Sequence, residues 1–262
     1  MAAKERIDIL VHERGLAPSR EKARGMIMAR EVLVNGAVVD KAGTRVSTEA
    51  EITVTGKPRF VSRGGDKLAA ALAAFPVDVS GRTAADVGAS TGGFTDALLQ
   101  HGAARVYAID VGYGQIDYAL RQDSRVVVIE RTNARYLDRL DEPVSFVSID
   151  ASFISLRLLL PVIRGWLTPQ ADVIPLIKPQ FEAGPRDVGK GGVVRDHAVH
   201  TRVLHEVLGF AAGTGFSVRG LITSPLKGPA GNTEFLAWLA WGQSEPGLDL
   251  DAAIRALVAT LD

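Results

Sequence analysis

The chain has 262 residues, of which 47% are hydrophobic and 23% are charged, a composition typical of a globular protein with one large domain or two smaller ones. Thirty basic residues balance thirty acidic ones, which by itself argues weakly against a nucleic-acid partner. The absence of cysteine excludes disulfides and thiolate metal sites. It fits a reducing compartment, and we therefore expect a cytoplasmic protein.

Neither a signal peptide nor a membrane-spanning helix is predicted from the sequence. The longest segment without a charged residue, 207–218, has twelve residues, whereas a spanning helix needs about twenty mostly apolar ones. A membrane partner is therefore not expected.

Residues 1–56 are predicted to form a small α+β module. Ser19 is a favourable N-cap for a helix, and Asn35-Gly36 between two apolar runs is typical of a β-hairpin turn. The predicted elements are a helix over 7–14, a helix from 19 through 28, hairpin strands over 31–34 and 37–39, and a strand over 51–55.

A linker over 57–60 and a larger domain over 61–262 are predicted to follow. Proline and charge separate two patterned regions at the linker. Beyond it, short apolar runs alternate with helix-length segments, which is typical of an α/β fold with a doubly wound, mostly parallel sheet. The predicted strands cover 83–87, 105–109, 126–129, 145–149, 173–177 and 235–241.

A glycine-rich loop follows the first of these strands. Asp86 lies at the end of the strand, Gly88, Gly92 and Gly93 come next, and a helix begins there, as at the nucleotide sites of open α/β sheets. The glycine spacing differs from the G-x-G-x-x-G pattern, which argues against a nicotinamide dehydrogenase. A carboxylate at Asp86 would repel a pyrophosphate but tolerate a sulfonium. The loop is therefore interpreted as an S-adenosylmethionine site.

Two further residues, which lie later in the chain than the loop, are assigned to the same cofactor. Asp110 lies at the end of the next strand, the usual place for an acid that accepts hydrogen bonds from ribose hydroxyls. Asn133 follows the third strand and is assigned to the adenine edge, with an ordinary turn as the alternative. The predicted cofactor residues are Asp86, Gly88, Ala89, Ser90, Thr91, Gly92, Gly93, Phe94, Asp110 and Asn133.

Four charged residues lie at element ends that a doubly wound sheet would bring together. They are Lys67, Asp150, Lys178 and Glu234. Each alone is the polar residue expected where a strand meets water. In this order, however, they resemble the catalytic tetrad of the FtsJ-like RNA 2'-O-methyltransferases. That resemblance implies a Rossmann-like class I methyltransferase sheet.

The chain as a whole is similar to the TlyA (haemolysin A) family, in which an alpha-L RNA-binding module precedes an FtsJ-like domain. In the N-terminal module, 19–23 and 32–36 carry the resemblance to alpha-L. In the larger domain, the resemblance is carried by 62–65, 86–94, 110–115, 130–135, 177–182 and 231–234.

The resemblance implies methyl transfer from S-adenosylmethionine to a cytidine ribose of ribosomal RNA, within a ribosomal subunit, by a monomer and without a metal. We expect Lys178, flanked by Asp150 and Glu234, to receive or steer the hydroxyl proton. Lys67 would disfavour the charged form of Lys178 and orient the ribose. Positioning can supply about 7–11 kcal/mol, whereas a general base contributes about 10²–10⁴-fold, so positioning is expected to dominate.

Basic residues in three places are predicted to contact RNA. The alternative for the basic residues of the N-terminal module is that they are ordinary solvated surface charges. The alternative for segment 184–195, which is also rich in glycine, is that it is merely flexible. The residues are Arg20, Lys22, Arg24, Arg30, Arg63, Arg186, Lys190 and Arg195.

Two other functions compete with this interpretation. A membrane-active haemolysin is disfavoured because no spanning segment or strongly basic amphipathic helix is predicted. An RNA-binding ribosome assembly factor without catalysis is disfavoured because it would not need all four residues of the tetrad.

Overall fold

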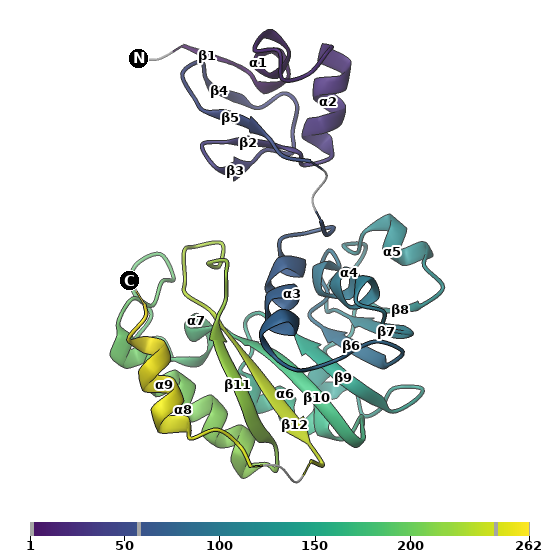
Figure 1. Cartoon of the computed structure of the whole chain (residues 1–262), viewed down its shortest axis with the longest axis vertical. Helices are drawn as coiled ribbons and strands as arrows, with labels where there is room; N and C mark the ends of the chain where they lie inside the picture. The colour runs from purple at the N-terminus through teal and green to yellow at the C-terminus, as the bar shows by residue number, and fades with distance from the viewer. Residues whose placement is uncertain (1–2, 57–58, 244–245, 262) are drawn as a thin grey trace. The chain divides into compact units, whose positions relative to one another are not determined.

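The computed structural model describes residues 3–56, 59–243 and 246–261. The chain divides into an N-terminal unit that ends at Arg59 and a larger unit that begins at Phe60 (Figure 1). The predicted linker spans this division, and its residues 57 and 58 lie outside the described part. No described helix combines the length and the apolar character needed to cross a lipid bilayer.

The N-terminal unit packs two helices against short strands. It contains β1 (Lys4–Arg6), α1 (Ile7–Glu13), α2 (Arg20–Met28), β2 (Val32–Val34), β3 (Ala37–Val38), β4 (Arg45–Ser47) and β5 (Ile52–Val54). Ser19 caps α2 as predicted, because its hydroxyl accepts a hydrogen bond from the Lys22 amide at 3.1 Å. Asn35 and Gly36 both have positive φ, the backbone that a tight hairpin turn requires. The antiparallel pair β1–β4 was not predicted, because each strand has three residues and includes charged ones.

The larger unit alternates strands and helices. Its elements are α3 (Gly64–Ala74), β6 (Thr83–Val87), α4 (Gly93–Gln100), β7 (Arg105–Ile109), α5 (Tyr118–Gln122), β8 (Val126–Ile129), η1 (Ala134–Tyr136), β9 (Val144–Ile149), α6 (Leu156–Arg164), β10 (Leu167–Ile177), α7 (Pro179–Glu182), α8 (His197–Gly213), β11 (Ser217–Thr223), β12 (Phe235–Trp241) and α9 (Leu250–Val258). All six predicted strands are present.

The strands form one seven-stranded sheet in the order β11-β12-β10-β9-β6-β7-β8. The five strands from β10 to β8 are parallel, and β12 is antiparallel to both of its neighbours. The chain builds outward from β6 through β7 to β8 and then returns to place β9 on the other side of β6. The carboxyl ends of β6 and β9 therefore flank a topological switch point, where open α/β sheets bind their ligands.

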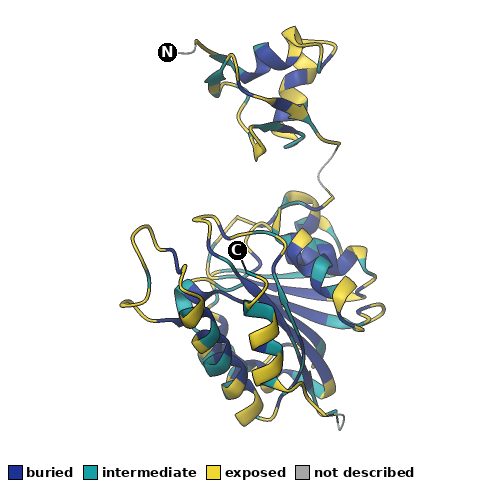
Figure 2. Ribbon diagram, turned by 60° about the vertical axis from the view of Figure 1, so that its left-hand side comes forward, coloured by how far each residue is buried: buried dark blue, intermediate teal, exposed yellow. Residues whose placement is uncertain are grey.

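Apolar side chains fill both faces of this sheet. One buried cluster joins the strands to α6, α8 and α9, and a second joins them to α3 and α4. Successive residues of β6 alternate between the clusters, since Ala84 belongs to one and Ala85 to the other. Figure 2 shows the sheet strands mostly buried, while the helices carry exposed residues along their outer faces. Because helices cover both faces of the sheet, the carboxyl ends of its strands are the part available for a binding site.

The strand β11 was not predicted from the sequence. It contains Arg219 and Gly220, which interrupt its apolar pattern. The glycine has a packing reason, because a Cβ at that position would lie 2.4 Å from the ring of Phe75. A close approach of this kind cannot be read from the alternation of apolar residues alone.

Candidate active site

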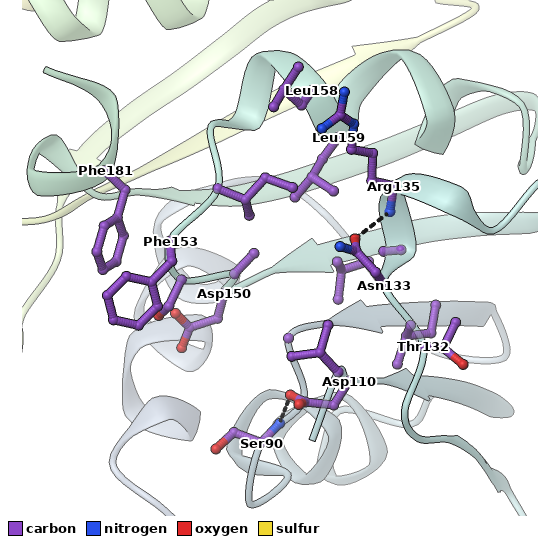
Figure 3. Close-up of a pocket in the computed structure, with 18 of the residues that line it drawn as sticks. Ser90, Asp110, Thr132, Asn133, Arg135, Asp150, Phe153, Leu158, Leu159 and Phe181 are labelled. Atoms are coloured by element: carbon purple, nitrogen blue, oxygen red, sulfur yellow. Dashed lines mark hydrogen bonds between the residues drawn. The ribbon is translucent and has the colours of Figure 1, made fainter. Parts of the chain in front are cut away.

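A cavity of about 760 Å³ lies beyond the carboxyl ends of β6, β7, β8 and β9 (Figure 3). Four of the predicted cofactor residues line it: Gly88, Ser90, Asp110 and Asn133. The catalytic candidate Asp150 lines it as well. The cavity is therefore bounded on one side by the glycine-rich loop and on another by a residue of the tetrad.

The glycine-rich loop passes directly against the end of β9. Gly88 has a φ of 83°, and a Cβ there would lie 2.7 Å from the backbone oxygen of Asp150. Gly92 has a φ of 95° and closes against Leu120, whose side chain would meet a Cβ at 2.3 Å. Only glycine satisfies both the positive φ and the close approach. These contacts explain two of the glycines without reference to a ligand.

Asp110 holds the loop and faces the cavity. Its two carboxylate oxygens accept hydrogen bonds from the backbone amides of Ser90 at 2.8 Å and Gly112 at 2.7 Å. Figure 3 shows its side chain within the pocket, with the bond to Ser90 drawn. A carboxylate has further acceptor positions, so Asp110 can still bind a hydroxyl.

Asn133 is fixed by one side of its amide. Its Oδ1 accepts a hydrogen bond from the Arg135 backbone amide at 3.0 Å, which caps the short helix η1. The Nδ2 group is left as a donor at the cavity wall. The turn role and the ligand role, treated as alternatives from sequence, are therefore compatible in one side chain.

Asp86 lies under the loop and is not among the residues that line the cavity. It is fully buried, and it accepts hydrogen bonds from the Thr95 hydroxyl at 2.7 Å and the Ser148 hydroxyl at 3.1 Å. Burial raises the pKa of Asp86 to about 7, against the lowering effect of these two hydroxyls. The sequence assigns this carboxylate to the cofactor, and that assignment stays a prediction; in the structure the carboxylate contacts hydroxyls of α4 and β9.

The other predicted cofactor residues also lie outside the lining of this cavity. Phe94 is buried in the core cluster beneath α3 and α4, with its ring near Gly64. The loop contributes its backbone at Gly88 and Ser90 instead. The remaining residues of this group are Ala89, Thr91, Gly92 and Gly93.

The tetrad forms two separate ion pairs. Lys67 Nζ lies 2.5 Å from Glu234 Oε2, and both side chains are buried. Lys178 Nζ lies 2.6 Å from Asp150 Oδ1. Among the described residues, Glu234 is paired with Lys67 and not with Lys178. The expectation that Glu234 and Asp150 both flank Lys178 is therefore corrected by this structure, because α3 brings its own lysine to Glu234.

Gln180 contacts the Lys67–Glu234 pair and is not predicted from the sequence. It lies on α7, two residues after Lys178, and its Nε2 donates a hydrogen bond to Glu234 Oε1 at 3.1 Å. Its own Oε1 is buried without a hydrogen-bond partner among the described residues. Lys178 also donates to the Ser152 hydroxyl at 3.0 Å. The only sequence signal for Gln180 was its place beside Lys178.

Two aromatic rings lie beside Lys178. The Phe153 and Phe181 rings are 4.8 Å apart, and the Lys178 ammonium is 5.8 Å from the Phe181 ring. Phe153 is 90% exposed and has a φ of 62°, a rare backbone for a bulky residue. Figure 3 shows both rings next to Asp150 at the pocket wall. An exposed, strained aromatic residue at this position points to a function outside the core.

A buried carboxylate holds the segment that carries Phe153. Glu182, at the end of α7, accepts hydrogen bonds from the Leu156 amide at 2.7 Å and the Ser155 hydroxyl at 2.6 Å. Burial raises the pKa of Glu182, while the two donors lower it. The helix that follows Lys178 is thereby tied to the segment that follows Asp150.

The predicted RNA residues of the larger unit are exposed. Arg63 precedes α3, while Arg186, Lys190 and Arg195 belong to the segment between α7 and α8. Hydrogen bonds and burial hold part of the segment between α7 and α8 in place. Asn232 accepts a hydrogen bond from the Val194 amide and donates one to the Gly192 oxygen, both at 2.9 Å, and Val193 and Val194 are buried.

Two arginine–aromatic pairs near the cavity were missed from sequence. Arg131 lies over the Tyr113 ring at 4.1 Å, and Arg135 lies near the Tyr136 ring at 5.5 Å. Both tyrosines are largely exposed. Interleaved basic and aromatic residues in 113–136 were the available signal.

The predicted RNA residues of the N-terminal unit fall into two groups. Arg20 and Arg24 each bind the carboxylate of Asp8, at 2.9 and 3.0 Å. Lys22 is exposed on α2, and Arg30 follows the helix with a φ of 64°.

Both units match known protein families. Residues 60–241 match the FtsJ-like methyltransferases, and residues 5–52 match the S4 domain. The Bacillus subtilis protein YqxC, provisionally named an rRNA methyltransferase, is 51% identical over 94% of this chain and 90% of YqxC. The 16S/23S rRNA (cytidine-2'-O)-methyltransferase TlyA of Mycobacterium tuberculosis is 46% identical over 98% of each chain.

A solved structure extends the likeness to three dimensions. The structure of a hemolysin-named protein from Streptococcus thermophilus has a TM-score of 0.77 and 46% identity, and covers 99% of this chain and 96% of that chain. The sequence, the parallel sheet with its cavity and these relatives agree. The chain is a methyltransferase of the FtsJ-like family with an N-terminal S4 domain, and it belongs to the TlyA family.

Proposed function

We propose that this protein transfers a methyl group from S-adenosylmethionine to a cytidine ribose 2'-hydroxyl of ribosomal RNA within a ribosomal subunit. The observation that carries the proposal is the pair of lysine–carboxylate contacts, Lys67–Glu234 and Lys178–Asp150, at the carboxyl edge of the sheet. Asp150 belongs both to one of these pairs and to the cavity wall. The relatives named as rRNA methyltransferases support the substrate. We propose that the enzyme acts as a cytoplasmic monomer.

The residues around the cavity fit S-adenosylmethionine. Asp110 presents acceptor positions for ribose hydroxyls, and Asn133 presents an amide donor for the adenine edge. Gly88 and Ser90 bring the backbone of the glycine-rich loop to the cavity wall. When bound, S-adenosylmethionine supplies an electrophilic methyl group on a sulfonium. The proposed mechanism assigns no step to a metal.

Lys178 is proposed to orient the nucleophile. Its ammonium is held by Asp150 and the Ser152 hydroxyl, so its direction is fixed before substrate arrives. An N–H from this group can donate to the 2'-oxygen and hold that oxygen in place. As the oxygen bonds to the methyl carbon and the carbon–sulfur bond breaks, the hydroxyl proton passes to the Asp150 carboxylate. Most of the rate enhancement is then positional, on the order of 7–11 kcal/mol.

The Lys67–Glu234 pair is proposed to set the position of the ribose. Gln180 binds Glu234 and follows Lys178 by two residues, so α7 carries a contact of each pair. Gln180 Oε1 has no hydrogen-bond partner in the described part of the chain, and we assign it as an acceptor for a ribose hydroxyl.

The aromatic and basic side chains around the cavity are proposed to hold the RNA. The Phe153–Phe181 pair offers a ring surface beside Lys178 on which a base can stack. Arg131, Arg135 and the exposed cations Arg63, Arg186, Lys190 and Arg195 are assigned to phosphates.

The test uses purified ribosomal subunits that lack the modification. The protein is incubated with labelled S-adenosylmethionine, and the modified position is mapped. Lys178→Ala is expected to lower the single-turnover rate by about 10²–10⁴-fold without weakening S-adenosylhomocysteine binding, whereas the exposed control Lys227→Ala is expected to retain activity. Label on a base would contradict the ribose substrate. A wild-type rate in Lys178→Ala would contradict the role of that lysine.

A further inference from the structure

Three arginines of the N-terminal unit converge on one buried carboxylate. Arg6, Arg20 and Arg24 each direct Nε toward Asp8, with N–O distances of 2.9, 2.9 and 3.0 Å. The Asp8 side chain is fully buried, whereas the three arginine side chains are 37–48% exposed. The carboxylate therefore lies beneath a surface formed by three guanidinium groups.

The electrostatics of this cluster are unbalanced. Burial raises the pKa of the Asp8 carboxyl, but hydrogen bonds from Arg6, Arg24 and Arg20 outweigh burial and hold the pKa well below its usual range. Asp8 is thus an anion, and it compensates one of three positive charges. Three guanidiniums in such proximity repel one another, and only a shared anion keeps them together.

The outer N–H groups of the arginine cluster are available to bind a ligand. A guanidinium has five N–H donors, and Asp8 takes the Nε–H of each arginine. Among the described residues, the Nη groups of Arg20 and Arg24 donate to no protein acceptor. Ordering a mobile arginine side chain on a ligand costs conformational entropy, and prior ordering by Asp8 removes that cost.

We infer that Asp8 is a positioning residue, which gathers Arg6, Arg20 and Arg24 into a preformed site for an RNA phosphate. The inference rests on the proposed RNA substrate and adds to it both Arg6 and the role of a buried acid. The inference also predicts the opposite of what net charge alone predicts for RNA affinity. Removal of a negative charge normally strengthens binding to RNA, because less repulsion remains. Removal of the Asp8 charge should weaken it.

The experiment compares two neutralising variants of the full-length protein. Asp8→Asn and Glu13→Gln remove the same charge from α1, but Glu13 is exposed and contacts none of the three arginines. Affinity for purified unmethylated ribosomal subunits is measured over a salt series. We expect about five- to tenfold weaker binding by Asp8→Asn and unchanged or slightly tighter binding by Glu13→Gln. Equal or tighter binding by folded Asp8→Asn would overturn the inference.

A second pair of variants covers the case in which Asp8→Asn disturbs folding, as judged by hydrogen exchange in α1 and α2. Arg24→Lys keeps the charge but loses the Nε contact and the fork of donors, so about threefold weaker binding is expected. Arg45→Lys, an exposed position in the same unit, is the control and should bind as the wild type does. Equal affinity of these two variants would contradict the inference.

Two further readouts separate positioning from a general structural effect. In an Arg6→Ala, Arg20→Ala, Arg24→Ala background, Asp8→Asn should cause no further loss, because all three residues through which it acts are absent. S-adenosylhomocysteine affinity should be unchanged in every variant. If the wild type binds subunits but does not methylate them, the proposed function fails while the cluster result stands. If methylation is found but Asp8→Asn binds normally, only the cluster inference fails.

Discussion

Asp8 in the N-terminal unit and Asp86 in the larger unit are both fully buried, and their surroundings are opposite. Asp8 is bound by three guanidiniums, whereas Asp86 is bound by the hydroxyls of Thr95 and Ser148. Burial raises the pKa in both cases, but arginines reverse the effect at Asp8 and hydroxyls do not at Asp86, where the pKa is about 7. Burial alone therefore does not decide the charge of a carboxyl; the presence of a cation does.

The largest expected effect comes from removal of the cations around Asp8. Replacement of Arg6, Arg20 and Arg24 by alanine leaves a carboxylate without compensation and should destabilise the N-terminal unit by about 2–4 kcal/mol. Hydrogen exchange of the α1 amides measures this loss. Addition of Asp8→Asn to the triple variant should restore much of the protection. Unchanged exchange in the triple variant would show that the cations do not support Asp8.

The next effect concerns the charge of Asp86. A carboxyl whose folded pKa is above its unfolded value binds a proton on folding, so its stabilising contribution is lost as the pH rises from about 4 through 7. Asp86→Asn should therefore gain about 2–3 kcal/mol relative to the wild type between pH 5 and pH 8. Denaturation is followed by tryptophan fluorescence, since Trp166, Trp238 and Trp241 all lie in the larger unit.

Asp66→Asn provides the control for that series, because Asp66 is exposed on α3. Its stability relative to the wild type should hardly change with pH. A pH-independent difference between Asp86→Asn and the wild type would contradict the raised pKa.

The smallest effect tests the hydroxyls. Thr95→Val removes one donor to Asp86 and should cost about 1–2 kcal/mol at pH 8, with a smaller cost at pH 5, where the carboxyl is protonated. Thr201→Val is the control, because Thr201 is half-buried on α8 and its hydroxyl donates to the backbone oxygen of His197. An equal cost at both pH values would mean that the hydroxyl does not stabilise the charge.

Much of the fold was predictable because it depends on local pattern. The six predicted strands are apolar runs long enough to stand out, and the glycine-rich loop after β6 marks the cavity edge. The strand β11 was missed because Gly220 makes room for Phe75, a contact between distant segments. Short polar strands such as β1 carry too little pattern to be recognised.

The candidate site was predictable in its positions but not in its pairings. The sequence placed Lys178 and Glu234 at element ends, yet which lysine meets which carboxylate depends on how α3 packs on the sheet. The surroundings of Asp86 are equally hard to predict, because an acid at the end of a strand gives the same sequence pattern whether it faces a cavity or lies beneath a loop. The sequence does not single out Asp8, because its three partners are 2, 12 and 16 residues away along the chain.

The approach of Gly88 to Asp150 has a consequence for engineering. A Cβ at Gly88 would lie 2.7 Å from the Asp150 backbone oxygen, and the Asp150 amide in turn donates to the Val87 oxygen at 2.8 Å. The cavity wall at Gly88 and the acid that pairs with Lys178 are thus joined by this close contact and this hydrogen bond. Efforts to adapt this scaffold to bulkier sulfonium analogues would have to open space elsewhere, at Asn133 or Leu158, because any enlargement at Gly88 would displace Asp150 as well.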